Sequence, residues 1–334
     1  PSGAEYEGAQ AQVTPGGTDW FDSIFDTAEI TNVSLSASGG GAEGRYLLSA
    51  NYLKQEGVII GNTGFERVGT RLNSEFKIGD NLTVSENLNI TYDKEGTTTG
   101  NAIQNAAFSS PLVPVYDTNG NFAGTYSNAA RVGIANNPVA DLIRGQDDYN
   151  KNLRVIGDIS LKWQITPQLS FKSQAGITMR DLNGRYFNAL NPEHGEAISN
   201  NTLTEQSFRQ DQWVVSNILN YKNSFGDHTL DVLVATEATK ENFKGFGALR
   251  TNYLFEDDSF YLLSNGAGVP VIDYASSSST SIFSLLATAN WSYGGKYFGQ
   301  LTVRKDDTSR FAKATSDAIF PSGNLSWIAS NEDW

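Results

Sequence analysis

Carboxylates, side-chain amides and two histidines are the groups in this chain that are capable of metal binding or acid–base catalysis. Residues 117–121 read Asp-Thr-Asn-Gly-Asn, which places oxygen ligands at alternating positions, as the start of a calcium loop does. A calcium loop also needs a bidentate Glu farther along, and none follows at that distance. Because Asn-Gly favours a type I′ turn, we predict a tight hairpin here. Calcium binding by Asp117, Asn119 and Asn121 is the alternative.

The remaining reactive groups do not assemble into a catalytic pattern. Acidic clusters at 147–148 and 256–258 fall in predicted loops, where such runs are usually solvated, with calcium again the alternative. A Ser-His-Asp triad needs a histidine beside a nucleophile in a cleft. His228 falls in a predicted short turn and His194 in a predicted exposed loop. The chain has no Cys, which removes thiol catalysis and Cys-zinc sites, so we expect no enzyme and no catalytic residue.

The composition favours an all-β protein. The 334 residues include 32 Gly, with 39% hydrophobic and 11% aromatic residues, a balance typical of sheets with many turns. No apolar run approaches the roughly 18 residues of a transmembrane helix, which leaves a membrane barrel of half-apolar strands open. The net charge of −13 argues against nucleic acid as a partner.

Residues 153–179 show the clearest strand pattern. Apolar residues occupy alternate positions from Leu153 to Trp163 and again from Leu169 to Met179, across a turn at 164–168. Such period-two alternation predicts a β-hairpin with one apolar and one polar face. Each arm is about 11 residues long, close to the length that crosses a bilayer as a tilted strand.

Similar patterns predict about 11 antiparallel strands between residues 30 and 329, joined by connections of alternating length. We predict short turns at 39–44, 78–81, 164–168, 223–228 and 294–295, and the other connections at 58–64, 93–150, 181–210, 240–281 and 305–317. Because antiparallel strands place alternate connections at opposite ends, all the short turns lie on one side. This asymmetry is typical of an outer-membrane barrel with short periplasmic turns and long external loops, so we predict a transmembrane antiparallel β-barrel.

Aromatic residues gather near the predicted short turns. An amphipathic ring prefers the membrane–water boundary, so these residues predict one aromatic girdle of a barrel. The alternative is the general preference of aromatics for strands. The predicted periplasmic girdle consists of Tyr46, Phe76, Trp163, Phe171, Tyr221, Trp291, Tyr293 and Tyr297.

Two further sets follow from the barrel hypothesis. Polar residues that alternate with the apolar ones are expected to face the lumen or a plug domain, with direct substrate contact as the alternative. They are Arg67, Arg71, Asn73, Glu75, Arg154, Asp158, Lys162, Lys172 and Gln174. Aromatics of the long loops are candidates to stack on substrate, or else to pack within the loops or against a lid protein. They are Phe108, Tyr116, Phe122, Tyr126, Tyr186, Phe187, Tyr253, Phe255, Phe260 and Tyr261.

Several motifs resemble the SusC/RagA family, TonB-dependent outer-membrane transporters of Bacteroidetes. At residues 18–25 the chain has TDWFDSIF, which predicts a helical turn capped by Thr18 or Asp19, and at 36–59 it has SASGGGAEGRYLLSANYLKQEGVI. Residues 64–90, 110–124, 293–311 and 320–334 look like the same family in the expected order. One departure is RKDDTSRF at 304–311, where the family usually has RRDGSSRF.

The resemblance implies about 11 strands of a roughly 22-stranded plugged barrel. Residues 1–29 would lead into the barrel and residues 30–334 would form part of it. The family's TonB box and plug domain have no counterpart here, so we expect the chain to be an internal piece whose missing strands the full-length chain supplies. The aromatic signal that ends the family's terminal strand is not matched either, Trp334 aside.

The resemblance also implies a function. It is nutrient uptake, with a SusD-like surface lipoprotein as lid, TonB as energy source, and oligosaccharides or peptides as substrate. The expected location is the outer membrane of a Gram-negative bacterium, with no cofactor unless calcium binds. A soluble secreted β-protein that binds carbohydrate and an outer-membrane hydrolase are the alternatives.

Overall fold

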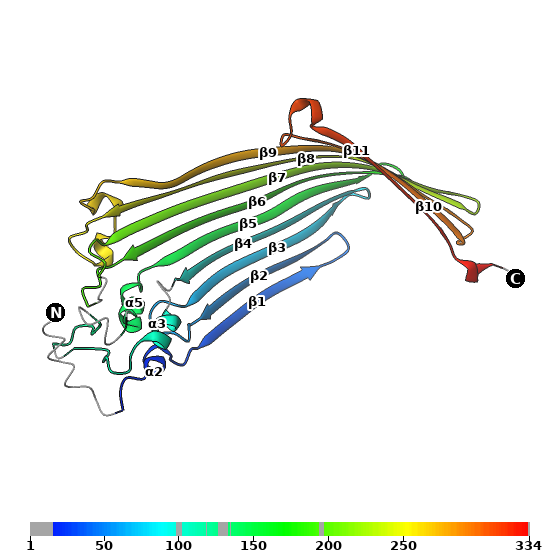
Figure 1. Cartoon of the computed structure of the whole chain (residues 1–334). Helices are drawn as coiled ribbons and strands as arrows, with labels where there is room; N and C mark the ends of the chain where they lie inside the picture. Colours follow the sequence, from blue (N-terminus) through cyan, green and yellow to red (C-terminus); the bar gives the residue numbers. More distant parts are fainter. Residues whose placement is uncertain are drawn as a thin grey trace.

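The computed structural model describes residues 16–97, 102–117, 119–125, 133, 135–193 and 197–332. In these residues one antiparallel sheet of 11 strands dominates, and each strand pairs with its neighbour in chain order (Figure 1). The strands are β1 (Ile30–Gly40), β2 (Gly44–Gln55), β3 (Phe65–Ile78), β4 (Leu82–Gly96), β5 (Tyr149–Gln164), β6 (Leu169–Asn188), β7 (Thr202–Phe225), β8 (His228–Thr251), β9 (Val271–Tyr293), β10 (Tyr297–Thr308) and β11 (Asp317–Trp327). The predicted all-β class and strand number are confirmed.

Helices are short and lie in the connections and at the ends of the chain. The α-helices are α2 (Trp20–Ile24), α3 (Ala102–Phe108) and α5 (Pro138–Arg144), and the 3₁₀ turns are η3 (Asp258–Phe260), η4 (Leu263–Asn265), η5 (Lys313–Thr315) and η6 (Ala329–Asn331). None of the helices in the described part of the chain is long and apolar enough to cross a membrane.

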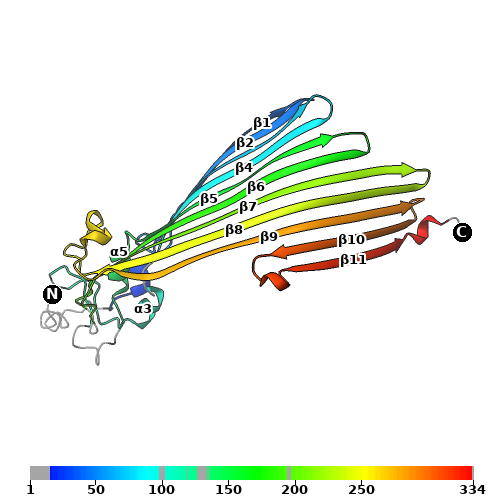
Figure 2. The ribbon, with the colours of Figure 1, turned by 90° about the horizontal axis from the view of Figure 1, so that it is seen from above.

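The connections alternate in length, as predicted. Short turns link β1 to β2, β3 to β4, β5 to β6, β7 to β8 and β9 to β10, at 41–43, 79–81, 165–168, 226–227 and 294–296. Longer connections at 56–64, 97–148, 189–201, 252–270 and 309–316 lie at the opposite end. The sheet stays open and curved, and α2, α3 and α5 gather at one end of its longest strands, whereas η5 lies apart from them beside β11 (Figures 1 and 2).

Two predicted loops are largely strand. The prediction placed loops at 181–210 and 240–281, whereas β6 continues to Asn188, β7 begins at Thr202, β8 runs to Thr251 and β9 begins at Val271. The hydroxyl tract at 276–280 lies inside β9 and pairs with β8. Alternation disappears there because polar residues occupy both faces, while the backbone pairing continues unchanged.

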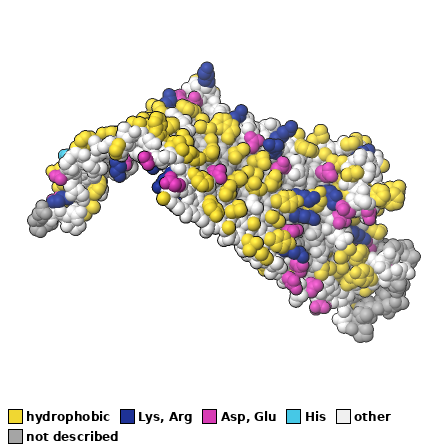
Figure 3. All heavy atoms as spheres, turned by 180° about the vertical axis from the view of Figure 1, so that it is seen from behind, with side chains coloured by type: hydrophobic (Ala, Val, Ile, Leu, Met, Phe, Trp, Pro, Cys, Tyr) yellow, Lys and Arg dark blue, Asp and Glu magenta, His cyan; other side chains and the backbone are white. Residues whose placement is uncertain are grey.

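The register separates the side chains onto two faces, as the alternation predicts. In one row across β3–β6, Leu72 pairs with Leu88, which pairs with Gly157 and through it with Ile177. The neighbouring row contains Asn73, Asn87, Asp158 and Gly176. We call the side of Leu72 and Ile177 the apolar face and the side of Asn87 and Asp158 the polar face. In Figure 3, apolar side chains gather over the middle of the sheet and charged ones are more numerous toward the end with the long connections.

A small helical cluster sits at the long-connection end. Helix α2 begins where Asp19 accepts a hydrogen bond from the backbone of Asp22 (3.0 Å), as the predicted cap requires. Trp20 is buried and donates from Nε1 to the carbonyl of Ser110 (3.1 Å). Its apolar neighbours come from α3 and α5, both of which lie in the connection from β4 to β5. Residues far apart in the sequence therefore share one core here.

Asn137 organises this cluster. Its Oδ1 accepts hydrogen bonds from the backbone N–H groups of Val139 (3.1 Å) and Ala140 (3.2 Å), which caps α5. Its Nδ2 donates to the carbonyls of Val115 (2.9 Å) and Ala123 (2.8 Å). The side chain is buried, and the Val115 carbonyl also accepts a hydrogen bond from the backbone N–H of Ala123 (3.0 Å), so the other three groups are the ones that lose a partner when Asn137 is removed.

We expect Asn137→Ala to loosen the connection between β4 and β5 by about 3 kcal/mol, because it removes a helix cap and two buried hydrogen bonds. Hydrogen–deuterium exchange of the full-length protein measures this as faster exchange at Val139 and Ala140. Gln146→Ala, at an exposed residue just beyond α5, is the control and should exchange as wild type does. Unchanged exchange in Asn137→Ala would contradict the role given to this side chain.

Candidate functional site

A hydrogen-bonded network of polar side chains crosses the polar face. Arg71 Nε donates to Asn73 Oδ1 (2.8 Å), and Asn73 Nδ2 donates to Asn87 Oδ1 (3.0 Å). Asn87 Nδ2 and Gln174 Nε2 both donate to the Asp158 carboxylate, at 3.1 Å each. The network joins β3, β4, β5 and β6, so it is a continuous polar wall.

The register places every predicted lumen-facing residue on this polar face. These residues are Arg67, Arg71, Asn73, Glu75, Arg154, Asp158, Lys162, Lys172 and Gln174. The structure thus brings them onto one surface, and their contact with a plug or a substrate stays a prediction.

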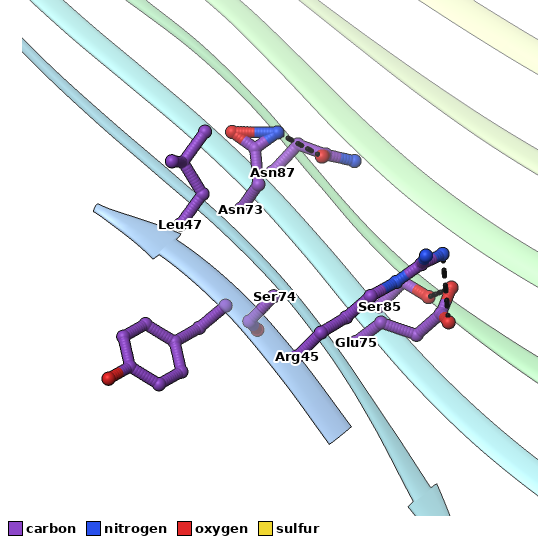
Figure 4. A pocket seen from close by; sticks show the side chains of 8 residues that line it. Arg45, Leu47, Asn73, Ser74, Glu75, Ser85 and Asn87 are labelled. Atoms are coloured by element: carbon purple, nitrogen blue, oxygen red, sulfur yellow. Dashed lines mark hydrogen bonds and ion pairs between the residues drawn. The ribbon is translucent and has the colours of Figure 1, made fainter. Parts of the chain in front are cut away.

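Near the short turns this wall contains a cavity of about 340 Å³. Arg45 forms an ion pair with Glu75 (3.1 Å), and Ser85 donates a hydrogen bond to the same carboxylate (3.4 Å). Figure 4 shows these three side chains together, with Asn73 and Asn87 one step along the strands. Arg45 is exposed, Glu75 and Ser85 are half-buried, and all three are paired with one another, so the cavity has the character of a polar wall.

The eight predicted girdle residues share the apolar face. Trp163 pairs directly with Phe171, and Tyr293 pairs with Tyr297 across the last short turn with ring centroids 6.2 Å apart. His228 belongs to the same group, because it accepts a hydrogen bond from Trp291 Nε1 (3.1 Å) and packs on Tyr293. His194, the other histidine, lies outside the described residues. A membrane-boundary position for the girdle stays a prediction.

The loop aromatics divide by burial. Phe108, Tyr116, Phe255 and Phe260 are exposed, whereas Phe122 and Tyr186 are half-buried. Tyr186 donates its hydroxyl to Asn150 Oδ1 (2.6 Å). Phe187, Tyr253 and Tyr261 are buried, and Tyr126 lies outside the described residues.

The buried three form one cluster in which the connection from β8 to β9 folds back onto the sheet. Phe187 stacks on Tyr261 with centroids 3.9 Å apart and meets Tyr253 edge-on at 5.5 Å. Arg250 holds the returning chain by donating to the carbonyls of Gly268 (2.8 Å) and Leu263 (3.1 Å). This burial favours the alternative that these aromatics pack inside the loop.

Asp148 lies beneath this cluster. Its Oδ1 accepts a hydrogen bond from the backbone N–H of Phe187 (2.6 Å), and its Oδ2 is buried with no partner among the described residues. Burial raises the pKa of the Asp148 carboxyl from 3.8 to about 7, and the Arg185 guanidinium opposes that shift. Arg185 itself pairs with Asp258 and donates to the carbonyl of Asp147 (3.2 Å). The acidic clusters at 147–148 and 256–258 are therefore brought together around one arginine.

The segment at 117–121 has the geometry of a turn. Asp117 Oδ1 accepts hydrogen bonds from the backbone N–H groups of Asn119 (2.8 Å) and Asn121 (2.9 Å), and Gly120 has φ of +81°. Tyr116 and Phe122 form a bridge on either side. These contacts favour the hairpin prediction. Within the described residues no group of three or more His, Asp or Glu is arranged to hold a metal ion, and calcium binding stays a prediction.

One cluster on the polar face was not found from the sequence. The rings of Phe208 and Tyr274 stack with centroids 5.3 Å apart, and Phe243 lies 6.2 Å from Phe208. Phe208 and Phe243, with Arg180, Leu182 and Gln210, line a cavity of about 230 Å³. The cluster was missed because its residues fall in, or beside, the segments predicted as loops. No spacing within one strand points to it, because its three rings come from β7, β8 and β9.

Comparison with known proteins shows which proteins this chain resembles. No protein-family model matches the chain. It is 27% identical over 331 residues to the TonB-dependent receptor P3 of Formosa agariphila, covering 96% of this chain and 32% of the receptor. It is 26% identical over 344 residues to the TonB-dependent receptor SusC of Bacteroides thetaiotaomicron, covering 95% of this chain and 33% of SusC.

Comparison with solved structures also points to TonB-dependent transporters. The RagAB peptide transporter superposes with a TM-score of 0.74 at 22% identity, over 93% of this chain and 36% of that one. The unliganded ferric citrate transporter FecA gives 0.52 at 11% identity, over 96% and 41%. The fold is therefore similar to an antiparallel segment of these transporters. The resemblance drawn from the motifs is confirmed at this level: the chain is similar to a SusC-like segment, and it spans about a third of the curated relatives' length.

We expect the connection from β8 to β9, which packs on Phe187, to loosen as the pH rises. Burial raises the pKa of the Asp148 carboxyl to about 7 in the folded protein. Between about pH 4 and 7 the folded protein therefore keeps this proton while the unfolded chain has lost it, so the stability of the folded connection falls as the pH rises through this window. Exchange at the Phe187 amide, corrected for its intrinsic pH dependence, should therefore accelerate between about pH 4 and 7 in wild type and change little above pH 7.

The variant Asp148→Asn distinguishes the effect of the charge from the effect of the hydrogen bond. Its side-chain amide keeps an oxygen that can accept from the Phe187 N–H, but it cannot ionise. Its corrected exchange should be independent of pH, whereas Asp227→Asn, in the distant turn between β7 and β8, should keep the wild-type dependence. A pH dependence of equal size in Asp148→Asn would show that another group is responsible.

Proposed function

We propose that this chain is part of the barrel wall of a TonB-dependent outer-membrane importer. The observation that carries the proposal is the combination of two segregated faces with short turns at one end and long connections at the other. A sheet that is apolar on one side and hydrogen-bonded among polar groups on the other suits a wall between lipid and a filled lumen. The similarity to TonB-dependent receptors over nearly the whole chain supports the same conclusion.

In this function the apolar face contacts lipid and the polar face contacts a plug or luminal water. Strand β1 pairs only with β2, and β11 only with β10, within the described residues. Unpaired backbone groups are costly in hydrocarbon, so the free edges of both strands would pair with further strands of the same barrel. The relatives, about three times as long, have room for those strands and for a plug.

The substrate would be an oligosaccharide or a peptide, captured at the long-connection end. A SusD-like surface lipoprotein would act as the lid, and TonB would supply energy through another part of the protein. The supports are the SusC match and the fold shared with the RagAB peptide transporter. No group of this chain is assigned a catalytic role.

Site-directed spin labelling tests the orientation of the faces directly. The chain contains no Cys, so single Cys substitutions in it can be labelled without background from this region. Labels at Ile159 and Ile177 should be relaxed by oxygen dissolved in lipid, and labels at Asp158 and Gln174 should not. Ile159 and Asp158 are adjacent on β5 and lie on opposite faces of the sheet. Equal relaxation of labels at these two positions would therefore rule out the assignment.

Uptake tests the activity. The full-length protein should require detergent for extraction and should migrate differently on gels before and after heating. Deleting its gene should abolish growth on an oligosaccharide or peptide that the parent strain imports, and plasmid expression should restore it. A buffer-soluble monomer would instead support the soluble carbohydrate-binding alternative.

A further inference from the structure

The apolar face of β5 is long enough to cross a membrane and then becomes polar. From Trp163 back to Leu153, alternate side chains on this face are apolar apart from Gly157, and this span of about 11 residues matches a tilted transmembrane strand. The next two residues on the same face are Lys151 and Tyr149. In the barrel wall proposed above, Lys151 therefore stands where the strand leaves the hydrocarbon on the side of the long connections.

The neighbouring strands change in the same way at the same level. On β4 the apolar band ends at Tyr92, and the next residue on this face, Lys94, lies directly opposite Lys151. The corresponding residues on β2 are Tyr52 and Lys54. A phenol ring is amphipathic and an ammonium group is costly in hydrocarbon, so tyrosines followed by lysines are the order expected where hydrocarbon meets charged headgroups. Lys and Arg side chains also gather beside the apolar middle of the sheet in Figure 3.

Three cations of this face surround a single aromatic ring. The centroid of the Tyr149 ring lies 3.9 Å from Lys151 Nζ and 5.8 Å from Lys94 Nζ. The guanidinium carbon of Arg185 lies 4.8 Å from the same centroid. These distances allow cation–π attraction, which holds the three positive charges near one another. Arg185 also has a carboxylate partner, because it pairs with Asp258.

The two lysines have no such partner. Lys94 is exposed and Lys151 is half-buried, and like charges directly opposite each other in a sheet are destabilising. Glu66 pairs in register with Lys94, and Asp147 accepts from Arg185 through its backbone carbonyl. Neither carboxylate forms an ion pair with the two lysines in the part of the chain that the structure describes. A pair of unbalanced cations in a chain of net charge −13 indicates an anionic ligand.

We propose that Lys94 and Lys151, beside Tyr149, bind the phosphate group of an anionic lipid in the membrane leaflet nearer the long connections. The acyl chains would lie along the apolar face of β5 while the phosphate meets both ammonium groups. Lysine binds phosphate as a point charge, and basic residues beside a membrane surface attract anionic headgroups. A free phosphate ion has the same charge, but the position of the lysines at the end of the apolar band favours the lipid. The inference rests on the barrel wall proposed above.

Lipid binding to the full-length protein in detergent tests the site. Wild type should bind phosphatidylglycerol, which is anionic, more tightly than phosphatidylcholine, which has no net charge. Lys94→Gln combined with Lys151→Gln should weaken phosphatidylglycerol binding about thirtyfold, because each basic residue beside a membrane surface contributes about 1 kcal/mol. Its binding of phosphatidylcholine should not change. Lys94→Arg combined with Lys151→Arg keeps both charges and should retain the preference for phosphatidylglycerol.

The matched control is Lys162→Gln combined with Lys172→Gln. These lysines also lie directly opposite each other, on β5 and β6, but on the polar face, which meets luminal water or a plug in the proposed barrel. The control therefore removes the same charge from the other side of the sheet and should bind both lipids as wild type does. Heat-modifiable migration should show that every double variant folds.

Three results would overturn the lipid site. They are equal binding of the two lipids by wild type, an equal loss in the control, and binding of inorganic phosphate as tight as that of phosphatidylglycerol, which would identify a free ion as the occupant. All three leave the importer proposal standing if the spin-label pattern holds and the gene supports uptake. Failure of the spin-label pattern would instead overturn the barrel wall, and the lipid site with it.

Discussion

Continuous backbone pairing is the constraint on which the rest of this structure depends. From β1 to β11 each strand bonds to its neighbour in chain order, and an irregularity in register appears between Gly247 and Ala248. Up to that irregularity the ladder is continuous, so whether a residue has an odd or even number within its strand fixes the face on which its side chain lies. The polar network through Asn87 and Asp158, and the apolar band beside it, are consequences of that single rule.

The same ladder carries two different distributions of side chains without interruption. Between the short turns and the level of Trp213, one face is apolar and the other polar. Beyond that level, Asp211, Asn242 and Ser279 make the formerly apolar face hydrophilic, while Phe208, Phe243 and Tyr274 make the other face aromatic. Backbone hydrogen bonds between the strands hold the sheet together along its whole length. Which side chains suit each face depends on whether that face meets an apolar or a polar medium.

The long connections are held by buried polar side chains that satisfy backbone groups of neighbouring segments. Asn137 serves four such groups, and Asn201 accepts from the Tyr253 backbone (2.7 Å) while donating to its carbonyl (3.0 Å). Arg144 joins Glu193 across two different connections (2.6 Å). These contacts order the end of the sheet that would receive substrate, and Asp148 adds a group whose charge depends on pH.

The sequence by itself determined the all-β class, the number of strands, the two faces and the ends at which long and short connections lie. Those features are local, because period-two alternation in stretches such as 153–163 records the environment of each strand directly. Only the tertiary structure decided that 181–188, 202–211, 240–251 and 271–281 are strand. In these segments polar residues such as Asp211 and Ser279 stand on the face that is apolar nearer the short turns, so the apolar–polar alternation that marks a strand is lost although pairing persists. The cluster of Phe208, Phe243 and Tyr274 and the site around Asp148 depend on contacts between residues from separate strands and connections, which no local pattern records.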